Sequence, residues 1–450
     1  MENEILERLG ELLELRAFKQ IKEILEEHNE VDTAEYLSSI SPKDATIIFR
    51  VLNKEVAADV FAYLDPDVQQ FIVSAMTDTE LADVMDELFV DELVDLVEEL
   101  PASIVQRVLK NVDPSRRATI NQFLKYPDNS AGSIMTSELI HLKMDMTVKQ
   151  AIDRIRNSDI DGEIIYTSYV TDAKRKLLGV VHMKDLLLSD DDTLIEDVMI
   201  EDFISTTTLT DKEEVGHLFS KYDLLNIPVT DNEGRLVGVV SIDDAVDVLV
   251  EEATEDFELM AAMKPSEKPY MQTGVFTLAK NRLVWLLVLM ISATISGTIL
   301  SKYQLAFAAY PLLVTFMPML TDTGGNAGSQ TSTTIIRGMA LSEIELSDFF
   351  RVWWKEIRVS ILVGAVLAAV NFGRVLLFHP GEFTIALIVS LSLLLTVMIA
   401  KSIATMMPML AKRLGADPAL MASPLITTIV DAVSLTIYFT IAQTVLGIGA

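Results

Sequence analysis

The 450-residue sequence contains no cysteine and only five histidines. The absence of cysteine excludes disulfides, thiolate metal sites, iron–sulfur clusters and thiol nucleophiles. The histidines are scattered, so the chain offers few ligands for a zinc or copper site. The carboxylate oxygens that bind Mg²⁺ and Ca²⁺ are abundant. The sequence has no phosphate-binding loop and no cluster of histidine with acids, so we do not expect an enzyme.

Basic residues are also scarce: 36 Lys and Arg stand against 66 Asp and Glu, a formal charge of −30. Residues 271–450 hold 11 basic and 8 acidic residues, which leaves 25 and 58 in the first 270. Half of the chain is nevertheless hydrophobic. An acidic, water-soluble half is therefore joined to a nearly uncharged apolar half, which excludes a single soluble globule and a disordered acidic chain. The acidic half would repel nucleic acid, and its acidic start does not resemble a signal peptide.

Five long apolar runs follow residue 271, and each can cross a bilayer, which takes about 20 residues. They cover approximately residues 282–301, 305–336, 357–378, 383–410 and 419–448. Basic residues gather before the first run, between the second and third, and between the fourth and fifth. The positive-inside rule then places the acidic N-terminal half in the cytoplasm and the C-terminus outside. We therefore expect a multi-pass protein of the cell (inner) membrane, an α-helical bundle of five spans surrounded by lipid.

The second run is too polar for a simple membrane anchor. It contains Gly324-Gly-Asn-Ala-Gly, flanked by Asp322 and Ser329 and including Asn326. Loosened backbone at membrane depth persists only where it faces protein or a water-filled cavity. The alternative is that the small and hydroxyl residues only pack helices against one another.

The fifth run carries Asp431 near its middle, seven residues after Pro424. A proline inside the span would free a backbone carbonyl near the acid, and the fourth run similarly holds Lys401 and Pro408. A carboxylate at mid-membrane is costly unless a cation or a partner meets it. We interpret Asp431 as part of an ion path. Two chains around a two-fold axis would place two such carboxylates across a shared pore, which suits the slowly dehydrating Mg²⁺ ion, so we expect a homodimer.

An internal repeat lies between residues 135 and 256. Leu178-Gly-Val-Val-His182 matches Val237-Gly-Val-Val-Ser241, and each unit is predicted as strand, helix, two short strands and helix. This pair resembles tandem CBS domains, α/β regulatory modules that commonly bind adenine nucleotides or ions. Ser241 and Asp244 occupy the positions that often hold a ribose, although Ser-x-x-Asp before an apolar helix is also a capping box. His182 replaces the hydroxyl in the first unit.

Residues 1–130 are predicted to be entirely α-helical, because apolar residues recur at helical spacing. Prolines at positions 42, 66, 101 and 114 mark helix starts. The pattern predicts a right-angled stack of short helices with an acidic surface. Asp91 and Asp95 stand one turn apart on one face, as a shared cation would require.

The order of these parts resembles the MgtE family of magnesium channels over the whole chain. The most specific stretches are residues 126–136, the Gly324-Gly-Asn-Ala-Gly segment, and residues 416–420 followed by 424–431. The resemblance implies an acidic helical domain (1–130), a CBS pair (131–256, dividing near 195), a connecting helix (257–280) and a transmembrane domain (281–450).

By the same resemblance, Asp431 holds the permeating Mg²⁺ between two protomers. Acids at matching positions would sense cytosolic Mg²⁺ and close the channel: Asp91, Asp95, Asp211, Glu213, Asp223, Asp244, Asp247, Glu252, Glu255, Asp256 and Asp417. Two amides that the family usually has near the pore ion are replaced here by Ser329 and Ser423. The replacement makes Mn²⁺ and Co²⁺ further candidate ions, because a shorter hydroxyl leaves more room for the hydrated ion.

Two other functions remain open at this stage. An ion-coupled divalent carrier would also place a carboxylate at the membrane midplane. A membrane-bound CBS sensor that transports nothing would carry polar residues only near the ends of its spans, and Asp431 argues against it.

Overall fold

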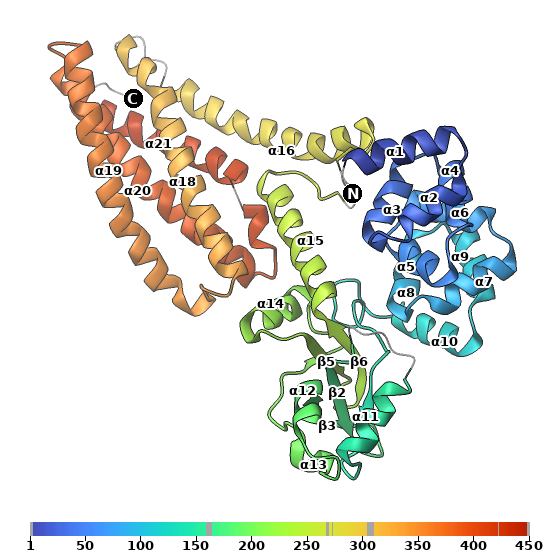
Figure 1. Ribbon diagram of the computed structural model, residues 1–450. Helices are drawn as coiled ribbons and strands as arrows, with labels where there is room; N and C mark the ends of the chain where they lie inside the picture. The colour runs from blue at the N-terminus through green and yellow to red at the C-terminus, as the bar shows by residue number, and fades with distance from the viewer. Residues whose placement is uncertain are drawn as a thin grey trace. The chain divides into compact units, whose positions relative to one another are not determined.

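The computed structural model describes residues 3–158, 164–266, 270–271, 273–303, 310–421 and 423–447, without the side chains of Asn3, Glu55, Ser292 and Ser423. The chain forms two compact units, residues 1–249 and 250–450 (Figure 1). The first unit holds the helical N-terminal domain and the repeat pair, and the second holds the long apolar helices.

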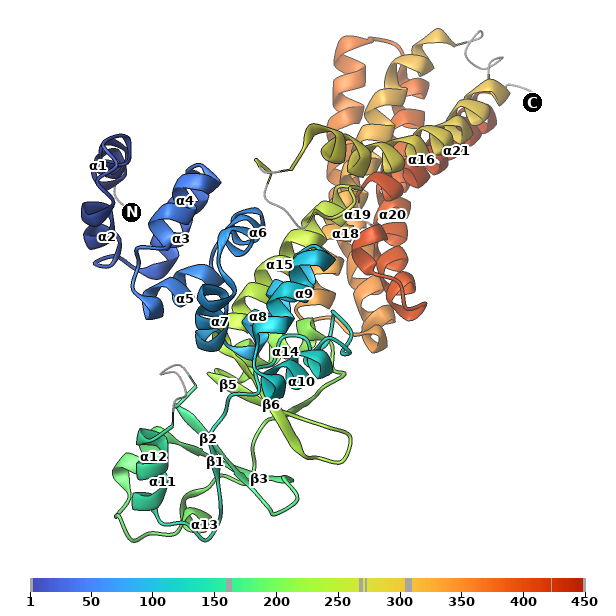
Figure 2. The same ribbon diagram turned by 90° about the vertical axis from the view of Figure 1, so that its right-hand side faces the viewer.

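The N-terminal domain is all-helical, as predicted. Its helices are α1 (Asn3–Glu14), α2 (Phe18–Leu25), α3 (Glu30–Ser39), α4 (Pro42–Phe49), α5 (Lys54–Ala62), α6 (Pro66–Ala75), α7 (Asp78–Glu87), α8 (Val90–Glu99), α9 (Ala102–Asn111) and α10 (Pro114–Phe123). Pro42, Pro66 and Pro114 lie in the first turns of their helices, where the missing N–H removes no hydrogen bond. Alternate helices pack together, α3 on α5, α5 on α7 and α7 on α9, which produces the stack in Figure 2.

The two repeat units have the predicted element order. The first contains β1 (His141–Leu142), α11 (Val148–Arg156), β2 (Thr167–Thr171), β3 (Leu177–His182), α12 (Met183–Leu188) and α13 (Ile195–Val198). The second contains β4 (Thr206–Thr207), α14 (Lys212–Tyr222), β5 (Asn226–Thr230), β6 (Leu236–Ser241) and α15 (Ile242–Met260). In each sheet the first strand pairs parallel with the second, and the second pairs antiparallel with the third.

Residues 126–136 join the helical domain to the second repeat unit. Ala131 N–H donates to the Thr210 carbonyl at 2.7 Å, and Gly132 N–H donates to the Thr208 carbonyl at 3.0 Å. A Cβ at Gly132 would lie 2.5 Å from the Tyr126 ring, so only glycine permits this close turn. The hydrophobic core is continuous from the stacked helices into the second repeat unit, where it includes Phe219 and Val240.

The helix that leaves the repeat pair differs from the expected connecting helix at 257–280. α15 begins at Ile242 and ends at Met260. Ala262 adopts a left-handed backbone conformation with φ 54°, and Pro265 cannot donate a helical hydrogen bond, so the chain turns before the next helix starts at Val275.

The second unit is built from long helices. They are α16 (Val275–Lys302), α18 (Met317–Ala340), α19 (Phe349–Phe378), α20 (Phe383–Arg413) and α21 (Ser423–Leu446), with short 3₁₀ segments η1 (Pro311–Phe316), η2 (Leu346–Asp348) and η3 (Pro418–Met421). α20 packs against α18, α19 and α21, and α16 contacts α21.

Four helical segments in the described part of the chain are long and apolar enough to cross a membrane: 275–302, 346–378, 383–413 and 418–446. α18, the expected second span, is not among them, because glycines, hydroxyls and Asp322 lower its hydropathy. Its 24 residues nevertheless reach about 36 Å, more than the hydrocarbon thickness of about 30 Å. The crossing of the membrane by α18 stays a prediction.

Candidate functional site

Glycines of α18 pack directly against its neighbours. A Cβ at Gly324 would lie 2.7 Å from Thr396 Cγ2 of α20 and 3.0 Å from Val430 Cγ1 of α21. A Cβ at Gly328 would lie 2.9 Å from Ile426 Cγ2 of α21. The small residues therefore do what the packing alternative expected of them: they let three helices approach closely.

The opposite face of α18 is polar and exposed. Asp322, Asn326, Gln330, Thr333 and Arg337 recur three or four positions apart and are all exposed in the single chain. A polar stripe of this kind cannot face lipid hydrocarbon, where unpaired polar groups cost several kcal/mol each. It must face water or another protein surface. The glycine face therefore fits the interpretation as helix packing, and the polar face fits the interpretation as a surface that faces water or protein.

Asp431 lies half-buried on α21, and its carboxyl is close enough to that of Asp322 for the two to interact electrostatically. The two acids come from helices that the glycines hold together. A divalent cation is the natural partner for two carboxylates at membrane depth.

The expectation that Pro424 frees a carbonyl inside the span is wrong. α21 begins at Ser423, so Pro424 lies in the first turn, where no helical hydrogen bond is lost. Its own carbonyl accepts hydrogen bonds from the hydroxyls of Thr427 and Thr428, both at 2.9 Å. Ser329 is half-buried on α18, and the side chain of Ser423 lies outside the described residues. Pro408, by contrast, does lie inside α20.

Lys401, which the sequence showed without a partner, is buried in an ion pair. Its Nζ lies 3.3 Å from Glu356 Oε2 of α19 and donates to Thr331 Oγ1 of α18 at 2.8 Å. Thr331 in turn donates to Glu356 at 3.1 Å. The three side chains join α18, α19 and α20. Glu356 was not predicted from the sequence. It stands among basic residues 351, 355 and 358, and nothing in this segment indicates a pairing with Lys401.

In the first unit, acids of α8 lie near acids at the start of α15. Burial, together with the negative charge of Asp91, raises the pKa of Asp244 to about 8, with Asp243 and Asp95 adding to the effect. Burial also raises the pKa of Asp91, whose Oδ1 has no hydrogen-bond partner among the described residues. Asp91, Asp95 and Asp244 were expected from the sequence. Asp243 was not, although its place in the first turn of α15 could have suggested it.

Three other predicted sensing acids lie on α14 or at its ends. Asp211 caps α14 by accepting from Glu213 N–H at 2.9 Å, and Glu213 Oε1 lies 3.5 Å from His217 Nε2, one turn along the helix. Asp223 ends the same helix in a left-handed conformation, a full helix length away. Local structure therefore gives Asp211 and Glu213 an ordinary explanation.

The remaining predicted acids lie on α15 and just before η3. They are Asp247, Glu252, Glu255 and Asp256, all on α15, and Asp417, which accepts from Ala419 N–H at 2.7 Å in front of η3. The end of α15, at Leu259 and Met260, packs against Ile336 of α18 and Ala419 of η3.

No group of three or more acids or histidines within the described ranges is arranged to hold one metal ion tightly. Mg²⁺ keeps several of its waters and usually takes only one or two carboxylates, so pairs of these acids suit it. Ser241 Oγ donates to Asp244 Oδ2 at 2.5 Å, a contact between side chains and not the backbone N–H bond of a capping box.

Family models match most of the chain. A model described as MgtE, divalent cation transporter, matches residues 317–441; the MgtE intracellular N domain matches 28–129; and CBS domains match 131–191 and 195–251. The chain is 34% identical to the magnesium transporter MgtE of Thermus thermophilus over 450 residues, 99% of each protein. It is 31% identical to that of Bacillus subtilis over 440 residues, 98% of this chain and 97% of that protein.

Two solved structures resemble the first unit. One is the soluble part of a magnesium transporter, with 30% identity, a TM-score of 0.51, and coverage of 56% of this chain and 98% of that one. The other is the cytosolic domain of the Mg²⁺ channel MgtE in complex with ATP, with 32% identity, a TM-score of 0.51, and coverage of 53% and 98%. Together with the polar faces of its apolar helices, these likenesses lead to one conclusion: the chain belongs to the MgtE family of divalent cation transporters and is a multi-pass membrane protein, not an enzyme.

Proposed function

We propose that this chain is a Mg²⁺ uptake channel of the cell (inner) membrane, in which two copies place their Asp431 carboxylates around a shared cation path. The observation that carries the proposal is the exposed polar stripe of α18, because it cannot face lipid and lies beside Asp431. The apolar length of α16 is also exposed in the single chain, which leaves it for lipid or for a second copy. Relatives named as magnesium transporters support Mg²⁺ as the substrate.

Cytosolic Mg²⁺ closes this channel. Without a cation, Asp91, Asp95 and Asp244 repel one another where α8 meets α15. Mg²⁺ shared by pairs of these acids removes the repulsion and fixes α15. The far end of α15 contacts Ile336 and Ala419 next to the cation path, so its position biases the gate. Moving a gate from mostly open to mostly closed takes about 5 kcal/mol, which several weak sites can supply together.

An ion-coupled carrier would use the same residues and is the second candidate. A CBS sensor without transport leaves the polar stripe of α18 without a role. An adenine nucleotide is a further proposed ligand of the CBS pair, supported by the relative whose cytosolic domain binds ATP. The cytoplasmic N-terminus follows from the distribution of basic residues.

Purified protein in liposomes tests the pore. Asp431→Ala should abolish Mg²⁺ uptake, and Asp431→Asn should reduce it strongly, while both proteins still insert. Glu382→Gln, an exposed acid in the turn before α20, serves as the matched control and should transport normally. Wild-type uptake by Asp431→Ala would refute the pore role. Single-channel currents with Mg²⁺ as the only cation separate the channel from the coupled carrier.

A further inference from the structure

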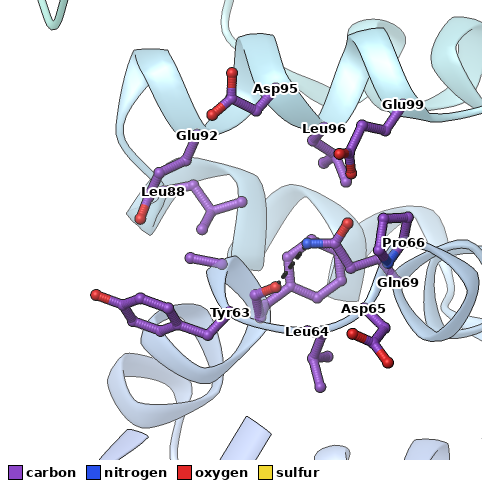
Figure 3. A pocket seen from close by; sticks show the side chains of 12 residues that line it. Tyr63, Leu64, Asp65, Pro66, Gln69, Leu88, Glu92, Asp95, Leu96 and Glu99 are labelled. Atoms are coloured by element: carbon purple, nitrogen blue, oxygen red, sulfur yellow. Dashed lines mark hydrogen bonds between the residues drawn. The ribbon is translucent and has the colours of Figure 1, made fainter. Parts of the chain in front are cut away.

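A pocket of about 270 Å³ opens on the helical N-terminal domain between α8 and the segment from the end of α5 to α6 (Figure 3). Its polar rim consists of Tyr63, Asp65, Gln69, Glu92, Asp95 and Glu99. Four of these six residues are acids, and no basic side chain lines the pocket. Any ligand must therefore be cationic.

The acids are spread along the pocket. Glu92 and Glu99 are seven residues apart on α8, about 10 Å along the helix axis. Figure 3 shows Glu92 on the side of Tyr63, and Glu99 on the side of Gln69 and Asp65. The apolar side chains of Leu88 and Leu96 lie on the same lining between them. The pocket thus has two anionic ends and an apolar middle.

One buried polar group points into this pocket without a partner. Gln69 is only 6% exposed, and its Nε2 donates to the Phe61 carbonyl at 2.9 Å. This bond fixes the orientation of the amide, because a carbonyl can only accept. Gln69 Oε1 is then left buried with no hydrogen bond to any described residue, and Figure 3 shows it turned toward α8. A buried acceptor without a donor costs about 1–3 kcal/mol, which a ligand with N–H groups would remove.

A single metal ion does not suit this arrangement. No three acids of the described residues converge on one point, and the pocket is long and partly apolar. An ammonium group donates three hydrogen bonds, and a methylene chain covers apolar surface. Charge-assisted bonds of about 2.8 Å at each end of a span of about 10 Å leave room for a short aliphatic chain.

We propose that this pocket binds an aliphatic diamine or longer polyamine, with an ammonium group at Glu92 and another between Asp65, Glu99 and Gln69 Oε1. Its methylenes lie against Leu88 and Leu96. The proposal does not depend on ion transport by the membrane helices. Because Asp95 also belongs to the acid cluster at α15, an occupied pocket would add positive charge beside that cluster.

Calorimetric titration of the full-length protein in nanodiscs of neutral lipid, at physiological ionic strength, tests the proposal. 1,4-Diaminobutane should bind one site per chain about tenfold more tightly than butylamine, which can reach only one end. Glu99→Gln and Asp65→Asn keep the side-chain shape and lie on different segments. Each should weaken diamine binding about tenfold. The melting temperature of each variant without ligand shows whether it is folded.

Glu98→Gln is the matched control, since Glu98 is an exposed acid of α8 that does not line the pocket. It should leave diamine affinity unchanged. Equal affinity for butylamine and diamine, or equal weakening by Glu98→Gln and Glu99→Gln, would show only general attraction of cations and overturn the proposal. Mg²⁺ alone binding with the same dependence on Glu99 and displacing the diamine would make the pocket a hydrated-metal site and also overturn it.

Discussion

The two units of this protein use carboxylates in different ways. The first 270 residues contain 58 acids, and burial clearly raises the pKa values of a few of them, among them Asp91 of α8 and Asp244 of α15, whose charges interact. The membrane half has 8 acids in 180 residues. Among them, Asp431 and Asp322 lie together, and Glu356 pairs with Lys401.

The difference follows from solvation. In water a charged carboxylate has little free-energy cost, so an acid indicates a functional site only when other acids or apolar surface surround it. At membrane depth every carboxylate needs a partner, so even a single acid there indicates a functional or paired site. The predictions below test this contrast, from the largest expected effect to the smallest.

Removing three predicted sensing acids of α8 and α15 should abolish control by Mg²⁺. In the triple variant Asp91→Ala, Asp95→Ala, Asp247→Ala, patch recordings should show a channel that stays open at high cytosolic Mg²⁺, a loss of about 5 kcal/mol of closing free energy. Deleting residues 1–130 should have the same effect.

The control for charge alone is the triple variant Asp145→Ala, Asp191→Ala, Asp192→Ala, which removes three exposed acids of the first CBS domain. It should close like the wild type. If the variant that lacks Asp91, Asp95 and Asp247 closed at the same internal Mg²⁺ as the wild type, these acids would be a solvated surface and not a sensor.

Breaking the ion pair of the membrane unit should destabilise it strongly. Lys401→Met leaves the Glu356 carboxylate without its cation, and the loss of one partner of a buried pair costs about 3–5 kcal/mol. Thermal unfolding in detergent should show a lowered melting temperature for Lys401→Met and a recovered one for Lys401→Met with Glu356→Leu. An unchanged single variant would mean that the pair contributes nothing.

Mg²⁺ binding by the cytosolic unit should strengthen as the pH rises. Asp244 has a folded-state pKa of about 8, above its ordinary 3.8, so between these values the folded protein holds a proton that the unfolded chain has released. Without Mg²⁺, stability should therefore fall with rising pH up to about 8. Mg²⁺ must displace that proton, so its affinity should rise by up to about tenfold per pH unit below pH 8.

Calorimetry in buffers of different ionisation enthalpy measures this proton release. Asp244→Asn should remove most of the pH dependence, whereas Asp185→Asn, the corresponding acid of the first repeat unit, should retain it. An equal pH dependence in the wild type and Asp244→Asn would exclude Asp244 as the displaced acid.

The smallest expected effect concerns ion selectivity. If Ser329 and Ser423 loosen the hydration shell of the permeating ion, Mn²⁺ and Co²⁺ should compete with Mg²⁺ uptake a few-fold better in the wild type than in Ser329→Asn with Ser423→Asn. Competition assays in liposomes measure this difference. Identical competition would show that the two serines do not set selectivity.

Much of the architecture could be predicted from the sequence. Prolines 42, 66 and 114 marked helix starts, and the repeated Gly-Val-Val strands gave the order of both CBS domains, because local backbone chemistry decides these features. The end of α15 was not predicted, since its apolar pattern continues past Met260 and only Pro265 and the left-handed Ala262 stop it.

The candidate site divides in the same way. Asp431 stood out from the sequence because its cost depends on depth in the membrane, which the length of the apolar run reveals. The way three helices meet decides which face of α18 packs and which face stays polar. It also decides that Lys401 pairs with Glu356. The same holds for the unpartnered Gln69 Oε1 in its acidic pocket. Composition and spacing thus determined the class of protein and pointed to Asp431, the acid whose burial in the membrane has the largest free-energy cost. Only tertiary packing decided which polar groups lie close together, because residues far apart in sequence set the distances between them.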